Sequence, residues 1–389
     1  MGKRSRVLAF LVSFGTLGLG LSAVGTLSAN ALSNCVVSNV QNSNGKVTFE
    51  IRYPDNTAGC DWIVPAGVTS IESAVVGGGG AGGWGNQGGG GGGGEVLHNQ
   101  NFTVTPGSVI PISIGTGGLV PTTVNRPGGN GNSTSFGDII ATGGGGGGGS
   151  GPFWLTANMS AVGGPGGSSG GNNIFGTAAA MTSAGRATYG AVNKSSYSGW
   201  TSYANRGGAG ISNTVAYGSQ VSYGSGAGGG GAYEAGTDST AVSNGSGGML
   251  TTLGRSGAGI YLMGKCLAGG GEGIYRVAAG TNTTASSTNF STANPCKTPS
   301  GVVVEGTRSG AFHVASGSMT PAANSGGGAS AGTTTAPNDG QPGANGVVLV
   351  SYTVPVPAIT SSNFTNVLRP IISGTGANGA TITISIGGA

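Results

Sequence analysis

The residues that could support acid–base or metal chemistry are few and widely spaced. Only two histidines occur, His98 and His313, and each lies in a segment with the composition of a β-strand. The 11 carboxylates are scattered along 389 residues, and no close pair suggests the two-acid chemistry of glycosidases. No Cys or His spacing typical of a zinc site occurs either. We therefore predict a non-enzymatic protein with no cofactor and no metal.

Two motifs resemble catalytic or nucleotide sites but lack part of the chemistry. Residues 259–266 fit GxxxxGK, yet Cys266 stands where the motif requires a Mg²⁺-binding hydroxyl. Residues 167–171 fit GxSxG, the pattern of a nucleophile elbow. With 87 glycines in the chain, such a match is expected by chance. Neither motif supports an enzyme.

The N-terminus has the features of a secretory leader. Residues 1–6 are basic, residues 7–27 are apolar, and residues 29–31 form an A-x-A cleavage site. A single membrane-spanning anchor is the alternative reading of the apolar stretch. Loss of Lys3, Arg4 and Arg6 with the leader leaves 12 basic against 11 acidic residues. We therefore expect export, no membrane insertion after cleavage, and no nucleic-acid partner.

Four cysteines remain after removal of the leader: Cys35, Cys60, Cys266 and Cys296. An even count in an exported chain favours disulfides. Three pairings are formally open. We expect the two local ones, Cys35–Cys60 and Cys266–Cys296.

Aromatic residues are concentrated in one stretch that is rich in Ser, Gly and Asn. This composition is typical of adaptable recognition surfaces, in which rigid rings anchor a ligand and small residues donate hydrogen bonds. The alternative is that the rings fill gaps between glycine segments. The candidate ligand-binding residues are Tyr189, Tyr197, Trp200, Tyr203, Tyr217, Tyr223 and Tyr233.

The elements that must position these residues are short strands separated by glycine blocks. Glycine blocks have no side chains with which to form a hydrophobic core or a stable helix. They occupy residues 77–80, 88–94, 143–149, 228–231, 269–271 and 326–328. Predicted strands occupy residues 36–41, 46–53, 71–76, 95–104, 109–114, 139–141, 301–305, 311–314 and 347–352. Because the strands cluster near the two ends, we interpret residues 143–300 as an irregular insertion.

Residues 62–71 and 74–80 resemble the opening of the bacterial glycine-rich domain, a family of secreted surface proteins and phage tail-tip proteins. Further landmarks of that family match residues 104–107, 114–118, 133–137, 141–144 and 343–352. The resemblance implies an all-β fold, a β-sandwich of jelly-roll or TNF-like type that carries polyglycine II helices. Residues 371–384 resemble the middle of bacterial Ig-like domains, which usually serve as stalks. Residues 186–233 are not glycine-dense, which departs from the family pattern.

The sequence thus predicts an exported bacterial surface or extracellular protein with a structural or adhesive role. Its expected partner is a glycan or a cell-surface polymer, and its oligomeric state is left open. The alternatives are an extracellular polysaccharide-active enzyme and a phage-type receptor-binding tip. The predicted parts are a signal peptide (1–31), an N-terminal β-hairpin (32–60), a glycine-rich β domain (61–353), a linker (354–357) and a partial Ig-like domain (358–389).

Overall fold

A computed structural model describes the chain as strands joined by turns and extended segments, and no helix occurs in the residues described. Those residues are 34–84, 88–122, 126–149, 162–172, 191–213, 223–243, 249–252, 254–273, 275–276, 295–311, 313–314, 317–318, 320–332, 340–355, 358–359 and 374–375. The predicted signal peptide lies outside them, as does most of the predicted Ig-like segment.

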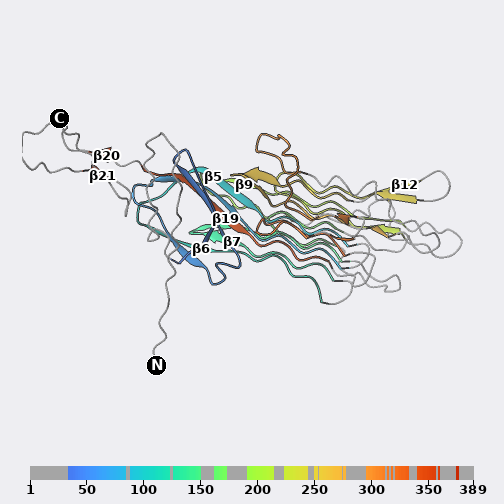
Figure 1. Ribbon diagram of the computed structural model, residues 1–389. Coiled ribbons are helices and arrows are strands. Elements are labelled where there is room, and N and C mark those ends of the chain that lie inside the picture. The colour runs from blue at the N-terminus through green and yellow to red at the C-terminus, as the bar shows by residue number, and fades with distance from the viewer. Residues whose placement is uncertain are drawn as a thin grey trace, which may run out of the picture.

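Two antiparallel sheets form one end of the molecule (Figure 1). The larger sheet has the order β1 (Val37–Ser43), β2 (Lys46–Arg52), β19 (Val347–Thr353), β4 (Ser70–Val76), β5 (Val96–Thr103) and β9 (Thr201–Tyr203). The smaller sheet has the order β3 (Cys60–Ile63), β6 (Val109–Ser113), β7 (Thr134–Phe136) and β8 (Ile139–Ala141). An all-β fold is therefore confirmed.

Shorter strands lie outside these two sheets. Three of them form a sheet, β10 (Ile211–Asn213), β11 (Tyr223–Ser225) and β16 (Tyr275–Arg276). The others pair as β12 (Thr240–Ser243) with β13 (Met249–Thr252), β14 (Ile260–Leu262) with β15 (Lys265–Leu267), β17 (His313–Val314) with β18 (Gly317–Ser318), and β20 (Ala358–Ile359) with β21 (Gly374–Thr375).

The interpretation of residues 143–300 as an irregular insertion is wrong, because this stretch contributes β9 to the large sheet and contains β14 and β15. The predicted strand at 301–305 is also wrong: its only ladder contact in the described chain is an isolated bridge between Lys297 and Val303. Backbone turns hold this segment. The Gly301 amide donates to the Thr298 carbonyl, and the Thr298 amide donates to the Val302 carbonyl.

The N-terminal hairpin turns at Asn44 and Gly45, as the sequence predicts. Ser43 pairs with Lys46, so the turn has two residues, and both have positive φ, 50° and 73°. This conformation matches the twist of the flanking strands and favours Asn-Gly. Strand β2 also pairs with β19 along its full length. The hairpin therefore belongs to the same sheet as the glycine-rich part of the chain.

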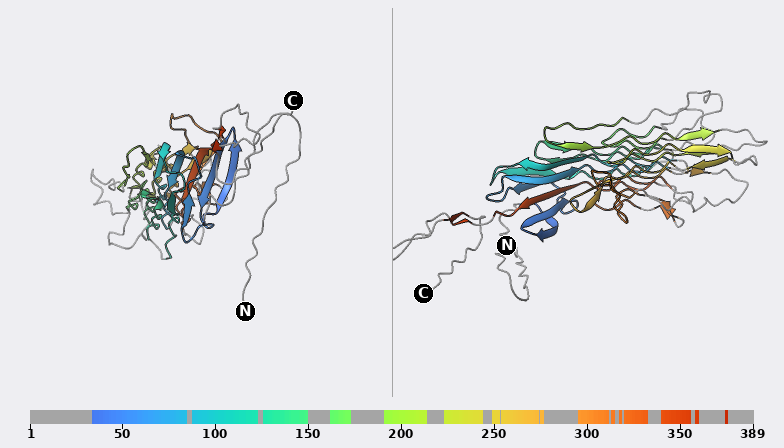
Figure 2. Two further views of the ribbon diagram at one scale, coloured as in Figure 1. Left: turned by 90° about the vertical axis from the view of Figure 1, so that its left-hand side faces the viewer. Right: turned by 90° about the horizontal axis from the view of Figure 1, so that it is seen from above.

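The last long strand of the sequence lies in the middle of the large sheet. β19 pairs with β2 on one side and with β4 on the other, and the end-on view in Figure 2 shows it in red between blue strands. Its two faces enter different cores. Val348 and Val350 pack in the first core between the two sheets, whereas Val347 and Leu349 pack in a second core beneath β14 and β15.

Burial on both faces explains the composition of the central strands. β4 alternates in the same way: Ile71 and Val75 face the first core, and Ala74 and Val76 face the second. A strand buried on both faces reads as a continuous apolar run instead of an alternating one. β2 differs because Val47, Phe49 and Ile51 face the first core while the alternate residues are polar.

The glycine segments extend away from the sheets as extended chains that run side by side (Figures 1 and 2). The backbone amides of segment 88–94 donate to three neighbouring segments in turn, and every third amide donates to the same segment. The donor–acceptor pairs are Gly89–Gly148, Gly90–Ala227, Gly91–Ala329, Gly92–Gly145, Gly93–Gly230 and Gly94–Gly326, at 2.7–3.0 Å. A period of three is that of an extended threefold helix, which has no internal hydrogen bonds.

The carbonyl oxygens of segment 88–94 accept from three further segments. The donors are Gly80, Gly83, Ser168, Gly171 and Gly271. Segment 88–94 is therefore bonded laterally to six others. Segment 77–83 follows the same rule, with its acceptors stepping by three along segments 89–95, 126–132 and 341–344. We call this set of laterally bonded segments the glycine array.

Part of the tyrosine-rich stretch also enters the array, although it is not glycine-dense. Gly208 donates to Gly228, and Ser169 donates to Asn205. Side chains complete the array where a neighbouring backbone is missing: Gly146 donates to the Asn130 side chain at 2.8 Å. Asn130 here supplies the amide oxygen that a backbone segment would otherwise provide.

Replacing Gly91 with Ala is expected to destabilise the protein by about 3 kcal/mol or more. A Cβ at Gly91 would lie 2.6 Å from the Gly80 carbonyl carbon and 2.8 Å from the Ala81 oxygen. The matched control is Gly107→Asn, because nothing lies within 4 Å of a Cβ there and Asn tolerates positive φ. Urea unfolding measures both variants. Equal stabilities of Gly91→Ala and wild type would contradict the array.

Candidate functional site

Both expected disulfides are present, Cys35–Cys60 and Cys266–Cys296. The first joins the start of the hairpin to β3. The second joins β15 to the segment 295–308, which lies outside the array. Each closes a loop of 25 or 30 residues, which is worth about 3 kcal/mol in the chain-entropy account.

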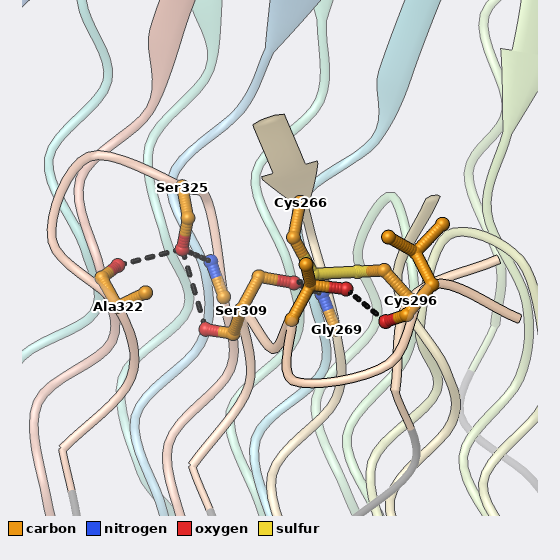
Figure 3. Close-up of a disulfide and its surroundings, with 9 residues drawn as sticks. Cys266, Gly269, Cys296, Ser309, Ala322 and Ser325 are labelled. Carbon is orange, nitrogen blue, oxygen red and sulfur yellow. Dashed lines mark hydrogen bonds between the residues drawn. A yellow bond between two sulfur atoms is a disulfide. The ribbon is translucent and has the colours of Figure 1, made fainter. Parts of the chain in front are cut away.

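Serine hydroxyls fix the second disulfide against the array (Figure 3). The Ser309 hydroxyl lies 3.7 Å from Cys296 Sγ and accepts from the Gly269 amide at 2.7 Å. The Ser325 hydroxyl donates to the Ala322 carbonyl at 2.6 Å, lies 3.3 Å from the Ser309 carbonyl oxygen, and accepts from the Gly327 amide. Hydrogen bonds and the disulfide thus connect segment 295–308 to the glycine array.

Of the predicted aromatic site, Tyr197 and Trp200 lie beside the first core. The Trp200 ring is 5.2 Å from the Phe102 ring. The Tyr197 hydroxyl accepts from the Ile140 amide at 3.1 Å. Both side chains are half-buried against core residues, so they help to pack residues 191–203 on the two sheets.

Tyr203 and Tyr233 lie instead beside the second core. Burial raises the pKa of Tyr203. Lys297 lies 5.7 Å from the centre of the Tyr233 ring. The four aromatic residues therefore divide between two clusters. Tyr189 and Tyr217 lie outside the described residues, and Tyr223 is placed only by its backbone, in β11.

A buried carboxylate that the sequence analysis missed binds residues 191–203, the segment that ends in β9. Glu95 is fully buried at the point where segment 88–94 becomes β5. It accepts four hydrogen bonds: from the Thr142 amide, from the amide and hydroxyl of Ser195, and from the Ser202 hydroxyl, at 2.5–2.9 Å. The position of Glu95 directly after the glycine block 88–94 was the sequence feature that could have identified it. Its role in the structure is to join β5, β8 and β9.

Charged residues form a second network on the large sheet. Lys46 Nζ and Glu72 Oε2 are 2.8 Å apart, and His98 Nε2 lies 3.2 Å from Glu72 Oε1. The hydrogen bond with His98 is the main cause of a lowered pKa of Glu72. Burial opposes it, and Lys46 lowers the pKa further, to about 2 from the ordinary 4.5. His98 is thus engaged with a carboxylate, and His313 lies in a different sheet.

The GxxxxGK and GxSxG matches both lie in parts of the fold where their residues are held by structural contacts. Residues 260–267 form the β14–β15 hairpin, and Cys266 is in a disulfide. Ser168 and Ser169 of the GxSxG match are fully buried in the array, where their hydroxyls accept from the amides of Asn205 and Gly207. Within the described parts of the chain, no group of three or more His, Cys, Asp or Glu residues could hold a metal ion.

The profile of the glycine-rich domain family matches residues 55–353. The chain belongs to the glycine-rich domain family. The match starts six residues before the predicted boundary at 61 and ends at the same residue, 353. No curated protein sequence matches the chain. Among the residues placed by the structure, no helix has the length and apolar character needed to span a membrane.

Stability is expected to fall between about pH 4.5 and pH 2 through Glu72. The pKa of Glu72 is lower in the folded protein than in the unfolded chain, so its contribution is complete above about pH 4.5 and is lost as the pH falls towards 2. Glu72→Gln should lower the free energy of unfolding at pH 7 and weaken this acid dependence. Urea unfolding at pH 7, 4.5 and 3 measures it.

The control for this experiment is Glu305→Gln, which removes an exposed carboxylate. An identical acid dependence in Glu72→Gln and wild type would contradict the contribution of the Glu72 carboxylate to stability between pH 4.5 and pH 2.

Proposed function

We propose that the protein is a non-enzymatic, exported protein of the bacterial cell surface or extracellular space, with a structural and adhesive role. The two disulfides support an oxidising compartment. The basic and apolar leader of residues 1–31 supports the same assignment from the sequence.

The hydrogen bonding of the glycine array carries this proposal. We interpret its segments as polyglycine II helices inserted into a jelly-roll type sandwich. Because the array is built from backbone, it offers few side chains for chemistry and many lateral bonds for rigidity. Such a body suits a spacer or platform that holds loops away from the sandwich.

The described carboxylates also favour a structural role over glycan hydrolysis. Glu50, Glu72 and Glu234 form ion pairs with lysines, and Glu95 is saturated with hydrogen bonds inside the protein. A glycosidase needs two carboxyl groups that face one substrate. These acids instead join elements of the fold.

We propose a glycan or cell-surface polymer as the partner, and an Ig-like stalk module beginning at residue 358. The described residues of this segment are those of the β20–β21 pair. The half-buried rings of Tyr197 and Trp200 remain a proposed contact surface for such a polymer.

Expression of the full chain with its leader in a bacterium tests the export proposal. We expect the protein in the medium or on the cell surface, starting at Leu32, with Cys35–Cys60 and Cys266–Cys296 linked. N-terminal sequencing and non-reducing peptide mapping measure this. Replacement of Ala29 and Ala31 by Phe is the control that should block processing. A cytosolic protein with four thiols would overturn the proposal.

A further inference from the structure

A groove of about 460 Å³ lies between the N-terminal hairpin and the turn between β14 and β15. It opens on the face of the large sheet that is opposite the first core. Its volume is within the range of small-molecule sites, roughly 300–1,000 Å³. The residues that line it include Asn39, Gln41, Thr48, Glu50, Met263 and Lys265.

The floor of the groove holds a fixed pair of opposite charges. Lys265 donates to Glu50 at 2.7 Å, and the two side chains are 21% and 11% exposed. Thr48 lies beside this pair, with its hydroxyl 2.7 Å from that of Ser351. The floor therefore offers hydrogen-bond donors and acceptors at set positions and carries no net charge.

One wall of the groove is shaped by a β-bulge. The register of β1 against β2 shifts between Ser38 and Gln41, and Asn39 has a φ of 51°. Bulges at sheet edges redirect side chains. The bulged stretch places the exposed side chains of Asn39 and Gln41 along the groove.

The opposite wall is held in place by covalent and ionic contacts. It consists of the turn at Met263 and Gly264, which have φ values of 49° and 81°. Lys265 follows and pairs with Glu50, and Cys266 is linked to Cys296. The wall is therefore rigid, and Met263 adds an apolar surface next to the polar floor.

We propose that this groove binds a neutral sugar unit of an extracellular polysaccharide. Two amides, a hydroxyl, a carboxylate and an ammonium group match the hydroxyls of a sugar, and the Glu50–Lys265 pair leaves no unbalanced charge for an ionic ligand. Met263 offers a small apolar contact for the C–H face of a sugar ring. This inference rests on the proposed adhesive function and gives it a binding site separate from the rings of Tyr197 and Trp200.

The double variant Asn39→Gly/Gln41→Ala tests the polar wall. Glycine keeps the left-handed conformation of residue 39, and both side chains are exposed, so the fold should be retained. The exported protein is screened for binding to a panel of defined mono- to hexasaccharides. The best saccharide is then titrated by calorimetry. We expect the double variant to bind about tenfold more weakly, with an unchanged melting temperature.

Asn42→Ala is the matched control, because Asn42 is an exposed amide on the same strand outside the groove. It should bind as wild type does. A second readout is the Met263 methyl resonance, assigned with Met263→Leu. It should shift when the saccharide is added to the wild-type protein.

The remaining outcomes separate the site from the function. Saccharide binding that is unchanged in the double variant, without a shift of the Met263 methyl, would overturn the groove and leave the adhesive function standing. A folded Trp200→Ala variant that no longer binds, together with a Met263 methyl resonance that does not shift when saccharide is added to the wild-type protein, would also overturn the groove. It would assign binding to the aromatic stretch. If the protein binds none of the saccharides in the screen, both the groove and the adhesive role are overturned.

Discussion

Lateral hydrogen bonds between glycine backbones are the interaction on which the rest of this structure depends. A buried amide or carbonyl without a partner costs about 1–3 kcal/mol, so a bundle of extended chains is stable only if neighbouring chains supply the partners. Segment 88–94 meets this requirement with six neighbours. The neighbours must approach closely, and Gly91 shows the consequence, because a single added methyl group would overlap the backbone of segment 77–83.

The large sheet sets the register of the array. β4 ends at Val76 and continues as segment 77–83, and segment 88–94 continues into β5. The pairing Val76–Val96 in the sheet is followed in the array by bonds from Gly77, Gly80 and Gly83 to residues 95, 92 and 89. Two chains that pair as ordinary strands therefore stay paired, but only at every third residue, since the other residues bond to other neighbours. Glu95 lies at this junction, where its four hydrogen bonds fix residues 191–203 to both sheets.

The sequence predicted those features that depend on local chemistry. Asn44-Gly45 identified the first turn, the alternation of residues 47–53 identified β2, and the cysteine positions indicated the two local disulfides. The order of the large sheet could not be predicted in this way, because β19 joins β2 and β4 from the far end of the chain. The role of Glu95 was missed for the same reason: its partners Thr142, Ser195 and Ser202 are brought together only by the fold. The groove likewise combines a bulge in β1 with a turn that is distant in the sequence.

Hydrogen exchange of the amides of residues 89–94 tests the central claim most directly. If these amides are bonded laterally inside the array, they should exchange only through global unfolding, with protection equal to that of Val75 and Leu97 in the large sheet. Two-dimensional NMR of the intact, uniformly ¹⁵N-labelled protein measures their rates. Exchange of residues 89–94 at the rate of an unstructured peptide, while Val75 and Leu97 remain protected, would contradict the account.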